Sequence, residues 1–128
     1  MHLLKQENPF ILLVDYYPAI AARLAVLLDE AGIRWPLKGA TSAAAALETI
    51  NRQLPLLVIM DIGLPGKTGI SLLHHIKTAW PAIPVIVLSN DTGSRYRDIC
   101  LEGGASYFLD KSLEFDQLPP LVSRLVAP

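Results

Sequence analysis

Five short apolar runs recur along the chain, and each is followed by a polar residue, a glycine or a proline. Three of them are almost continuous Val, Ile and Leu without alternation, which is typical of strands buried on both faces of a sheet. The second run contains Pro36, which cannot donate a backbone hydrogen bond, so we place it at an edge of the sheet. The predicted strands are Phe10–Val14, Trp35–Ala40, Leu56–Met60, Val85–Leu88 and Ser106–Leu109.

Segments of helical length lie between these runs. From Pro18 to Gly32 apolar residues recur at helical spacing, with a proline suited to the first turn and a glycine suited to the stop. The other predicted helices cover residues 43–53, 69–80, 93–102 and 114–126. Strand and helix alternate five times, which predicts an α/β fold. We expect a doubly wound five-stranded parallel sheet in a flavodoxin-like three-layer α/β/α arrangement, (βα)5, as a single domain over 1–128 with its core at about 9–126.

Composition and charge narrow the class of protein. Hydrophobic residues make up 52% of the chain and charged residues 18%, which argues against a disordered chain. A net charge of −1 provides no basic surface for phosphate contacts, so we expect no direct nucleic-acid binding. The longest apolar runs, such as Leu54–Met60, are too short to span a membrane. A single cysteine, Cys100, excludes an intrachain disulfide and suits a cytoplasmic location.

Four chemically active side chains follow the ends of predicted strands. Asp15, Asp61 and Ser89 end the first, third and fourth strands, and Lys111 follows the fifth. Ligands of open parallel sheets bind outside the carboxyl ends of the strands. We therefore expect two carboxylates, a hydroxyl and an ammonium to meet at one edge of the sheet.

The segments around these residues resemble the receiver domain of bacterial two-component response regulators. The motifs that carry the resemblance are Leu13–Asp15, Met60–Gly66 with Gly69, Val87–Ser89 and Gly104–Lys111. Each motif alone is weak, but four in order with family-like spacing are specific. The resemblance extends from about Pro9 to Val126.

The resemblance implies a role for each of these positions. Asp61 corresponds to the aspartate that accepts a phosphoryl group from a histidine kinase. Lys111 and Ser89 correspond to the residues that bind the phosphoryl group, and Ser89 and Phe108 to the pair that switches conformation. The implied function is a phosphoryl-accepting signalling switch, which is not an enzyme beyond self-phosphorylation from small donors and autodephosphorylation.

The resemblance also implies a Mg²⁺ site, with one departure from the family pattern. Asp15, Asp61 and the backbone carbonyl of Gly63 correspond to its ligands. The family usually has a second acid where this chain has Tyr16. A phenol stays neutral at ordinary pH, so we expect weak Mg²⁺ binding, with a loss of about 10–100-fold or more. A structural pairing of Asp15 with Lys111 is an alternative interpretation. A second, milder departure is Ser112, which stands where many members have proline.

Two other functions are alternatives to the switch. A phosphorylation-independent pseudo-receiver would use the same fold as a protein-binding module, because Tyr16 damages the metal site. A flavin protein or small phosphatase would need a phosphate loop or a second acid after the first strand, and Tyr16–Ala19 provides neither.

The resemblance further implies partners for the switch. They are a sensor histidine kinase or phosphotransfer protein and a downstream output domain or protein, and any homodimer is expected to be weak. The expected output face is the fourth helix, fifth strand and fifth helix, with Tyr96, Phe115, Pro119 and Pro120 as exposed contacts.

Overall fold

The computed structural model describes residues 8–91 and 93–126. In this part of the chain five parallel strands form one sheet in the order β2-β1-β3-β4-β5. The strands are β1 (Ile11–Val14), β2 (Leu37–Ala40), β3 (Leu57–Asp61), β4 (Val85–Ser89) and β5 (Tyr107–Asp110). The predicted doubly wound sheet is confirmed, and the run that follows Pro36 forms the edge strand β2.

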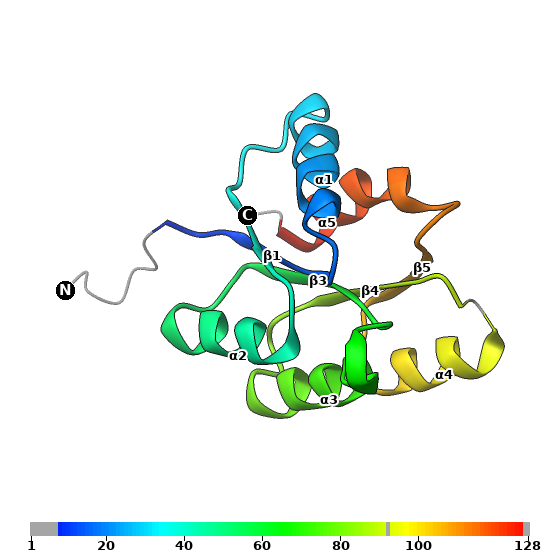
Figure 1. Cartoon of the computed structure of the whole chain (residues 1–128). Helices are drawn as coiled ribbons and strands as arrows, with labels where there is room; N and C mark the ends of the chain where they lie inside the picture. The colour runs from blue at the N-terminus through cyan, green and yellow to red at the C-terminus, as the bar shows by residue number, and fades with distance from the viewer. Residues whose placement is uncertain (1–7, 92, 127–128) are drawn as a thin grey trace.

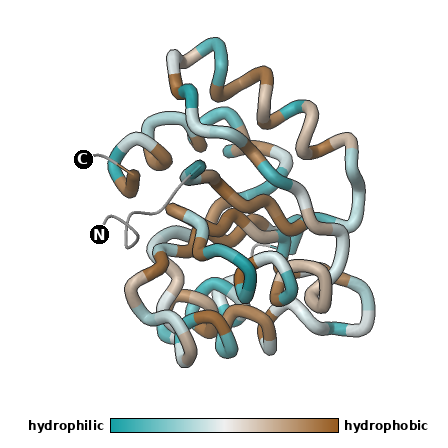
Figure 2. Tube along the Cα trace, turned by 90° about the vertical axis from the view of Figure 1, so that its left-hand side faces the viewer, coloured by the Kyte–Doolittle hydropathy of each residue, from teal (hydrophilic) through white to brown (hydrophobic). Residues whose placement is uncertain are grey.

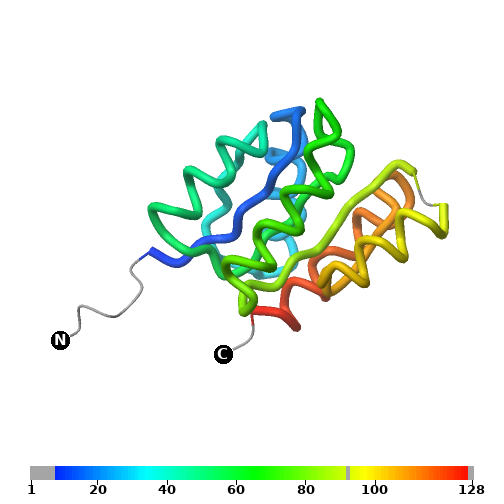
Figure 3. The backbone as a smooth tube through the Cα atoms, turned by 90° about the horizontal axis from the view of Figure 1, so that it is seen from below, coloured from blue at the N-terminus to red at the C-terminus, as the bar shows by residue number. Residues whose placement is uncertain are grey.

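Helices cover both faces of the sheet. They are α1 (Pro18–Glu30), α2 (Ala43–Arg52), α3 (Gly69–Ala79), α4 (Ser94–Glu102) and α5 (Leu118–Val126), with 3₁₀ turns η2 (Pro65–Lys67) and η3 (Phe115–Gln117). Helices α1 and α5 lie on one face, and α2, α3 and α4 lie on the other (Figures 1 and 3). This is the expected three-layer arrangement. Within the described residues, no helix has both the length and the apolar character needed to cross a membrane.

Alternate residues of each strand supply the two halves of the core. Leu12 and Met60 pack toward α2, α3 and α4, whereas Leu13 and Ile59 pack toward α1 and α5. The central strands are therefore apolar on both faces, as their continuous Val, Ile and Leu runs predicted. Figure 2 shows the resulting hydrophobic band through the middle of the molecule. Burial of each such side chain stabilises the fold by about 1.5–3 kcal/mol.

The last helix begins later than the sequence predicted. The segment 114–126 was expected to be one helix, but η3 comes first and α5 begins at Leu118. Pro119 and Pro120 follow at once, in the first turn of α5. Proline has no backbone N–H and clashes with the preceding turn, so a helix tolerates it only near its start. The two prolines therefore fix where α5 begins.

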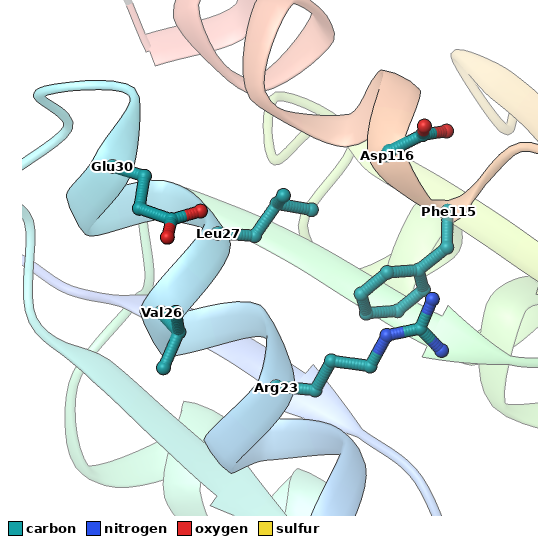
Figure 4. A pocket seen from close by; sticks show the side chains of 6 residues that line it. All are labelled: Arg23, Val26, Leu27, Glu30, Phe115 and Asp116. Atoms are coloured by element: carbon teal, nitrogen blue, oxygen red, sulfur yellow. The ribbon is translucent and has the colours of Figure 1, made fainter.

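Two of the four expected surface contacts are buried. Phe115 is 1% exposed and Pro119 is also buried, so the expectation that they form exposed contacts is wrong, whereas Tyr96 and Pro120 are exposed. Phe115 packs in the core beneath α1 and α5, and the guanidinium carbon of Arg23 lies 4.2 Å from the centre of its ring (Figure 4). A cavity of about 370 Å³ remains between α1 and η3, and its walls are Arg23, Val26, Leu27, Glu30, Phe115 and Asp116.

The loop after β3 folds closely onto the start of α3. A Cβ atom at Gly69 would lie 2.0 Å from the carbonyl oxygen of Ile62, so only glycine fits there. Within the loop, Gly66 and Lys67 both have left-handed backbone conformations, with φ of 74° and 57°. These features keep the loop compact beside the end of β3.

Candidate functional site

The sheet places the four predicted site residues at the same edge. Asp15 directly follows β1, Asp61 and Ser89 end β3 and β4, and Lys111 directly follows β5. All four are buried, with exposed fractions of 3%, 7%, 1% and 8% in that order. A parallel sheet explains this convergence, because its strands all end at one edge. The roles of these residues remain to be tested.

Lys111 is the centre of a buried ion-pair network. Its Nζ lies 2.7 Å from Oδ2 of Asp15 and donates a hydrogen bond of 2.9 Å to Oδ2 of Asp61. Burial lowers the pKa of Lys111, but its close contacts with the carboxylates of Asp15 and Asp61, and their negative charges, raise it more. The net effect is a pKa above the ordinary value of 10.5, so this lysine is held in its charged form.

Backbone amides fix the other carboxylate oxygens. The N–H of Tyr17 donates to Oδ1 of Asp15, and the N–H of Gly63 donates to Oδ1 of Asp61, both at 2.9 Å. Each strand-end carboxylate is thus oriented by the loop that follows it. Oδ2 of Asp15 is buried and, apart from its ion pair, receives no well-directed hydrogen bond from the described residues.

Ser89 is directed toward the β4–α4 loop. Its Oγ donates to the carbonyl oxygen of Asp91 at 2.7 Å and accepts from the N–H of Asp91 at 3.0 Å. Among the described residues, no hydrogen bond joins this hydroxyl to Asp61 or to the ammonium of Lys111. The predicted switch hydroxyl is therefore at the site, but it is engaged with its own loop.

Phe108 on β5 is already buried, with 3% of its surface exposed. The guanidinium carbon of Arg97 on α4 lies 5.7 Å from the centre of its ring, and Arg97 Nη1 donates to the carbonyl oxygen of Phe108 at 3.4 Å. The expected movement of Phe108 remains a prediction. In this structure its ring starts from a buried position.

The residue that departs from the family pattern, Tyr16, lies at the surface. Tyr16 is 52% exposed, and its ring packs edge-on against Tyr17 at 5.1 Å between centres. The ring of Tyr17 in turn lies 6.0 Å from the Nζ of Lys111. The second departure, Ser112, donates through Oγ to Oδ1 of Asn90 at 3.1 Å, which links the β5 and β4 loops.

The donor set fits a weakly held Mg²⁺. This ion needs only one or two protein carboxylates together with waters, and Asp15 and Asp61 supply two. Oδ2 of Asp15 is buried and, apart from its ion pair with Lys111, receives no well-directed hydrogen bond from the described residues, so it keeps lone pairs for a second cation. Within the described residues, however, no group of three His, Cys, Asp or Glu side chains is placed to hold a metal. The missing third acid corresponds to Tyr16. The ligand role of the Gly63 carbonyl stays a prediction.

A cavity of about 560 Å³ opens in front of Asp61. Its walls come from the ends of β3 and β4, from the loops after β1, β3, β4 and β5, and from the first turns of α3 and α4. They are Tyr17, Asp61, Ile62, Gly63, Leu64, Lys67, Ile70, Ser89, Asn90, Asp91, Tyr96 and Lys111. Sequence reasoning did not single out Lys67 as part of this site. The only local signal was its place after Gly66 in the loop, which does not reveal where the side chain lies.

Comparison with known proteins agrees with the fold. Residues 11–123 match the family described as the response regulator receiver domain. The chain is 36% identical over 117 residues to the transcriptional activator protein ExaE of Pseudomonas putida. The matched region covers 91% of this chain and 55% of ExaE. It is 28% identical to the DNA-binding transcriptional regulator NtrC of Escherichia coli, covering 80% of this chain and 24% of NtrC.

Solved structures of receiver domains share the fold of this chain. The receiver domain of NtrX from Brucella abortus superposes with a TM-score of 0.80 at 31% identity, covering 91% of this chain and 97% of that domain. The chain therefore spans about half, or less, of the curated relatives, but nearly all of an isolated receiver domain. Because the fold and these matches agree, the chain belongs to the response regulator receiver domain family.

Proposed function

We propose that this domain accepts a phosphoryl group on Asp61 and thereby switches a protein-interaction face. Receiver domains are signalling domains of two-component systems, and phosphorylation on an aspartate is general for the family. The observation that carries the proposal is the position of the Asp61 carboxylate. It is hydrogen-bonded to Lys111 at 2.9 Å and also lines the cavity through which a donor can approach.

The chemistry is nucleophilic attack by a carboxylate. An oxygen of Asp61 forms a bond to the phosphorus of the donor, while the bond between phosphorus and the leaving group breaks and its electrons stay with the leaving group. Lys111, held in its charged form, supplies positive charge beside the transferred group. The N–H of Gly63 keeps the Asp61 carboxylate oriented during the approach.

Mg²⁺ is a cofactor of receiver domains in general, and Asp15 and Asp61 would hold it here. When bound, it supplies charge that neutralises the phosphoryl oxygens against the carboxylates. Because Tyr16 contributes no acid, we expect Lys111 to carry more of that neutralisation in this chain than in one with three acids.

The switch follows from the engagement of Ser89. Once Asp61 carries a phosphoryl group, the Ser89 hydroxyl gains a charged acceptor and can exchange its bonds to Asp91 for a bond to a phosphoryl oxygen. Because Asp91 precedes α4, this exchange would move the start of α4. We infer that α4, β5 and α5 form the output face. Exposed apolar side chains on α4, namely Tyr96, Ile99 and Leu101, support that inference.

The partners we propose are a sensor histidine kinase or phosphotransfer protein on the input side and an output domain or protein on the other. Relatives such as ExaE and NtrC are transcriptional regulators and are much longer than this chain. Response regulators are generally cytoplasmic, and we assign this domain the same location.

Intact-mass measurement tests the proposal directly. Incubation with acetyl phosphate and Mg²⁺ is expected to add about 80 Da, one phosphoryl group. Asp61→Asn keeps the shape of the side chain but removes the nucleophile, so this variant is expected to gain nothing. Asp110→Asn is the matched control, because Asp110 also ends a strand, β5, but does not line the cavity. A mass gain in Asp61→Asn equal to that of the wild type would refute Asp61 as the acceptor.

A phosphorylation-independent pseudo-receiver is the second candidate, and the position of Tyr16 favours it. Tyr16 is exposed and supplies no carboxylate, and Lys111 already pairs with both remaining carboxylates. On this alternative the wild type gains no mass under the same conditions, and Ser89→Ala leaves partner binding unchanged.

A further inference from the structure

The cavity in front of Asp61 contains a cation that the buried ion pairs do not use. Lys67 and Lys111 both line this cavity. Lys111 lies within 2.9 Å of the carboxylates of Asp15 and Asp61, so its charge is already matched. Lys67 is exposed and, within the described part of the chain, makes no salt bridge and no side-chain hydrogen bond. Its ammonium is therefore free to meet a ligand.

The other charges around the cavity repel an incoming anion. Asp61 and Asp91 line it, and Asp15 lies directly behind Lys111. Three carboxylates thus outnumber the one paired ammonium. A phosphoryl donor carries negative charge and must come close to Asp61. With Tyr16 in place of an acid, less metal charge is available to attract that donor. A further cation at the cavity would therefore help to attract it.

The backbone conformation of Lys67 also indicates that a lysine is present at this position for a functional reason. With φ at 57°, it adopts a conformation that glycine and asparagine accept more easily than lysine does. Such conformations tend to persist where function requires them. The turn η2 places this lysine at the wall of the cavity despite that cost.

We propose that Lys67 is a donor-binding residue, whose ammonium pairs with the phosphate oxygens of a small dianionic phosphoryl donor before transfer. The proposal rests on the proposed function of Asp61 and adds the residue that attracts the donor. During transfer the phosphorus changes its bond from the leaving group to an oxygen of Asp61. Lys67 gives up no proton and forms no covalent bond.

Phosphorylation rates at varied acetyl phosphate concentration test the proposal. Lys67→Asn removes the charge but keeps a residue that tolerates the left-handed backbone, and Lys67→Arg keeps the charge. Lys38→Asn is the matched control, because Lys38 is an exposed lysine on β2 that does not line the cavity. We expect Lys67→Asn to raise the half-saturating donor concentration by roughly two- to fivefold, as for one exposed charge pair, with the maximal rate almost unchanged.

Two further readouts separate a charge effect from a structural one. Lys67→Arg is expected to restore the wild-type half-saturating concentration. Added salt is expected to raise that concentration more in the wild type than in Lys67→Asn, because salt screens a charge that the variant lacks. An unchanged half-saturating concentration in Lys67→Asn, an equal rise in Lys38→Asn, or a fall in maximal rate alone would each overturn the proposal.

Binding of inorganic phosphate distinguishes failure of this proposal from failure of the proposed function. Phosphate titrated into the wild type is expected to shift the backbone amide resonances of residues 66–68, and Lys67→Asn is expected to bind it roughly two- to fivefold more weakly. If the wild type gains no phosphoryl mass, the proposed function fails, but the phosphate titration still decides the role of Lys67. Equal phosphate affinities in the two proteins would exclude that role.

Discussion

Replacing Lys111 with methionine tests how strongly the buried ion-pair network stabilises this domain. Methionine keeps an unbranched side chain but removes the ammonium that lies 2.7 Å from Asp15 and 2.9 Å from Asp61. The side chains of these two aspartates are only 2% and 10% exposed, so water offsets little of the lost charge. Removing one partner of a buried ion pair costs about 3–5 kcal/mol, and we expect a loss of this size in the free energy of unfolding.

Urea unfolding of Lys111→Met and the wild type at pH 7.5 and pH 5.5 measures the loss in the free energy of unfolding. The comparison of the two pH values tests whether the loss comes from the unpaired carboxylates. Without Lys111, the folded carboxylate pair takes up a proton more readily than the unfolded chain does. The variant should therefore become more stable relative to the wild type as pH falls, by up to about 1.4 kcal/mol for each pH unit over which one extra proton is bound. Lys38→Met is the control. Lys38 is exposed on β2, and its Nζ lies 4.2 Å from the centre of the Phe10 ring, so its loss is expected to cost no more than about 1 kcal/mol.

At alkaline pH the wild type is expected to lose the stability that Lys111 contributes. Burial lowers the pKa of Lys111, but its close contacts with the negatively charged carboxylates of Asp15 and Asp61 outweigh this effect and raise the pKa above 10.5 in the folded state. The contribution of Lys111 is thus complete below pH 10.5 and is lost as pH rises through the raised value. Lys111→Met should lack this loss. A destabilisation under about 1 kcal/mol at pH 7.5, with no dependence on pH, would refute the buried network in solution.

The remaining predictions concern three single positions. Tyr16→Asp is expected to raise Mg²⁺ affinity about tenfold or more in a calorimetric titration, and equal affinities would contradict the assignment of the missing ligand. Ser89→Ala should still gain the phosphoryl mass but show smaller amide chemical-shift changes along β5, because one hydrogen bond of about 1–3 kcal/mol to a charged group is lost. A full wild-type response would exclude the Ser89 relay. Gly69→Ala is expected to cost about 3 kcal/mol or more in urea unfolding, since its Cβ would lie 2.0 Å from the Ile62 carbonyl. The control is Gly39→Ala, whose Cβ would meet nothing closer than 3.6 Å and should be nearly neutral.

The sheet was predictable because its signal is local. Short unbroken apolar runs such as that of β3 are typical of strands covered on both faces. A polar residue at the end of each run then marks the same edge of a parallel sheet. Asp61 and Lys111 could therefore be placed together although they are far apart in sequence. Strand bounds differ from the prediction by one residue in most cases, while β2 begins at Leu37, after Pro36.

Features that depend on contacts between elements were not predictable in the same way. Phe115 carries no sign in its own segment that Arg23 of α1 covers its ring. The left-handed backbone of Lys67 is likewise set by how the loop folds onto α3. The start of α5 is a different case. Pro119 and Pro120 were visible in the sequence, and their restriction to the first helical turn would have corrected the predicted start.

The burial of Phe108 has a consequence for signalling. Its ring lies under Arg97 while Ser89 is still bonded to Asp91, so the two members of the expected switch do not occupy matching positions. Some partners bind only when the aromatic ring does not protrude from the surface. Such a partner could already bind this domain before any signal arrives. We expect a pathway that uses such a domain to have a measurable baseline output. Its input would then raise the occupancy of an existing complex, and the range between resting and stimulated output would be correspondingly narrow.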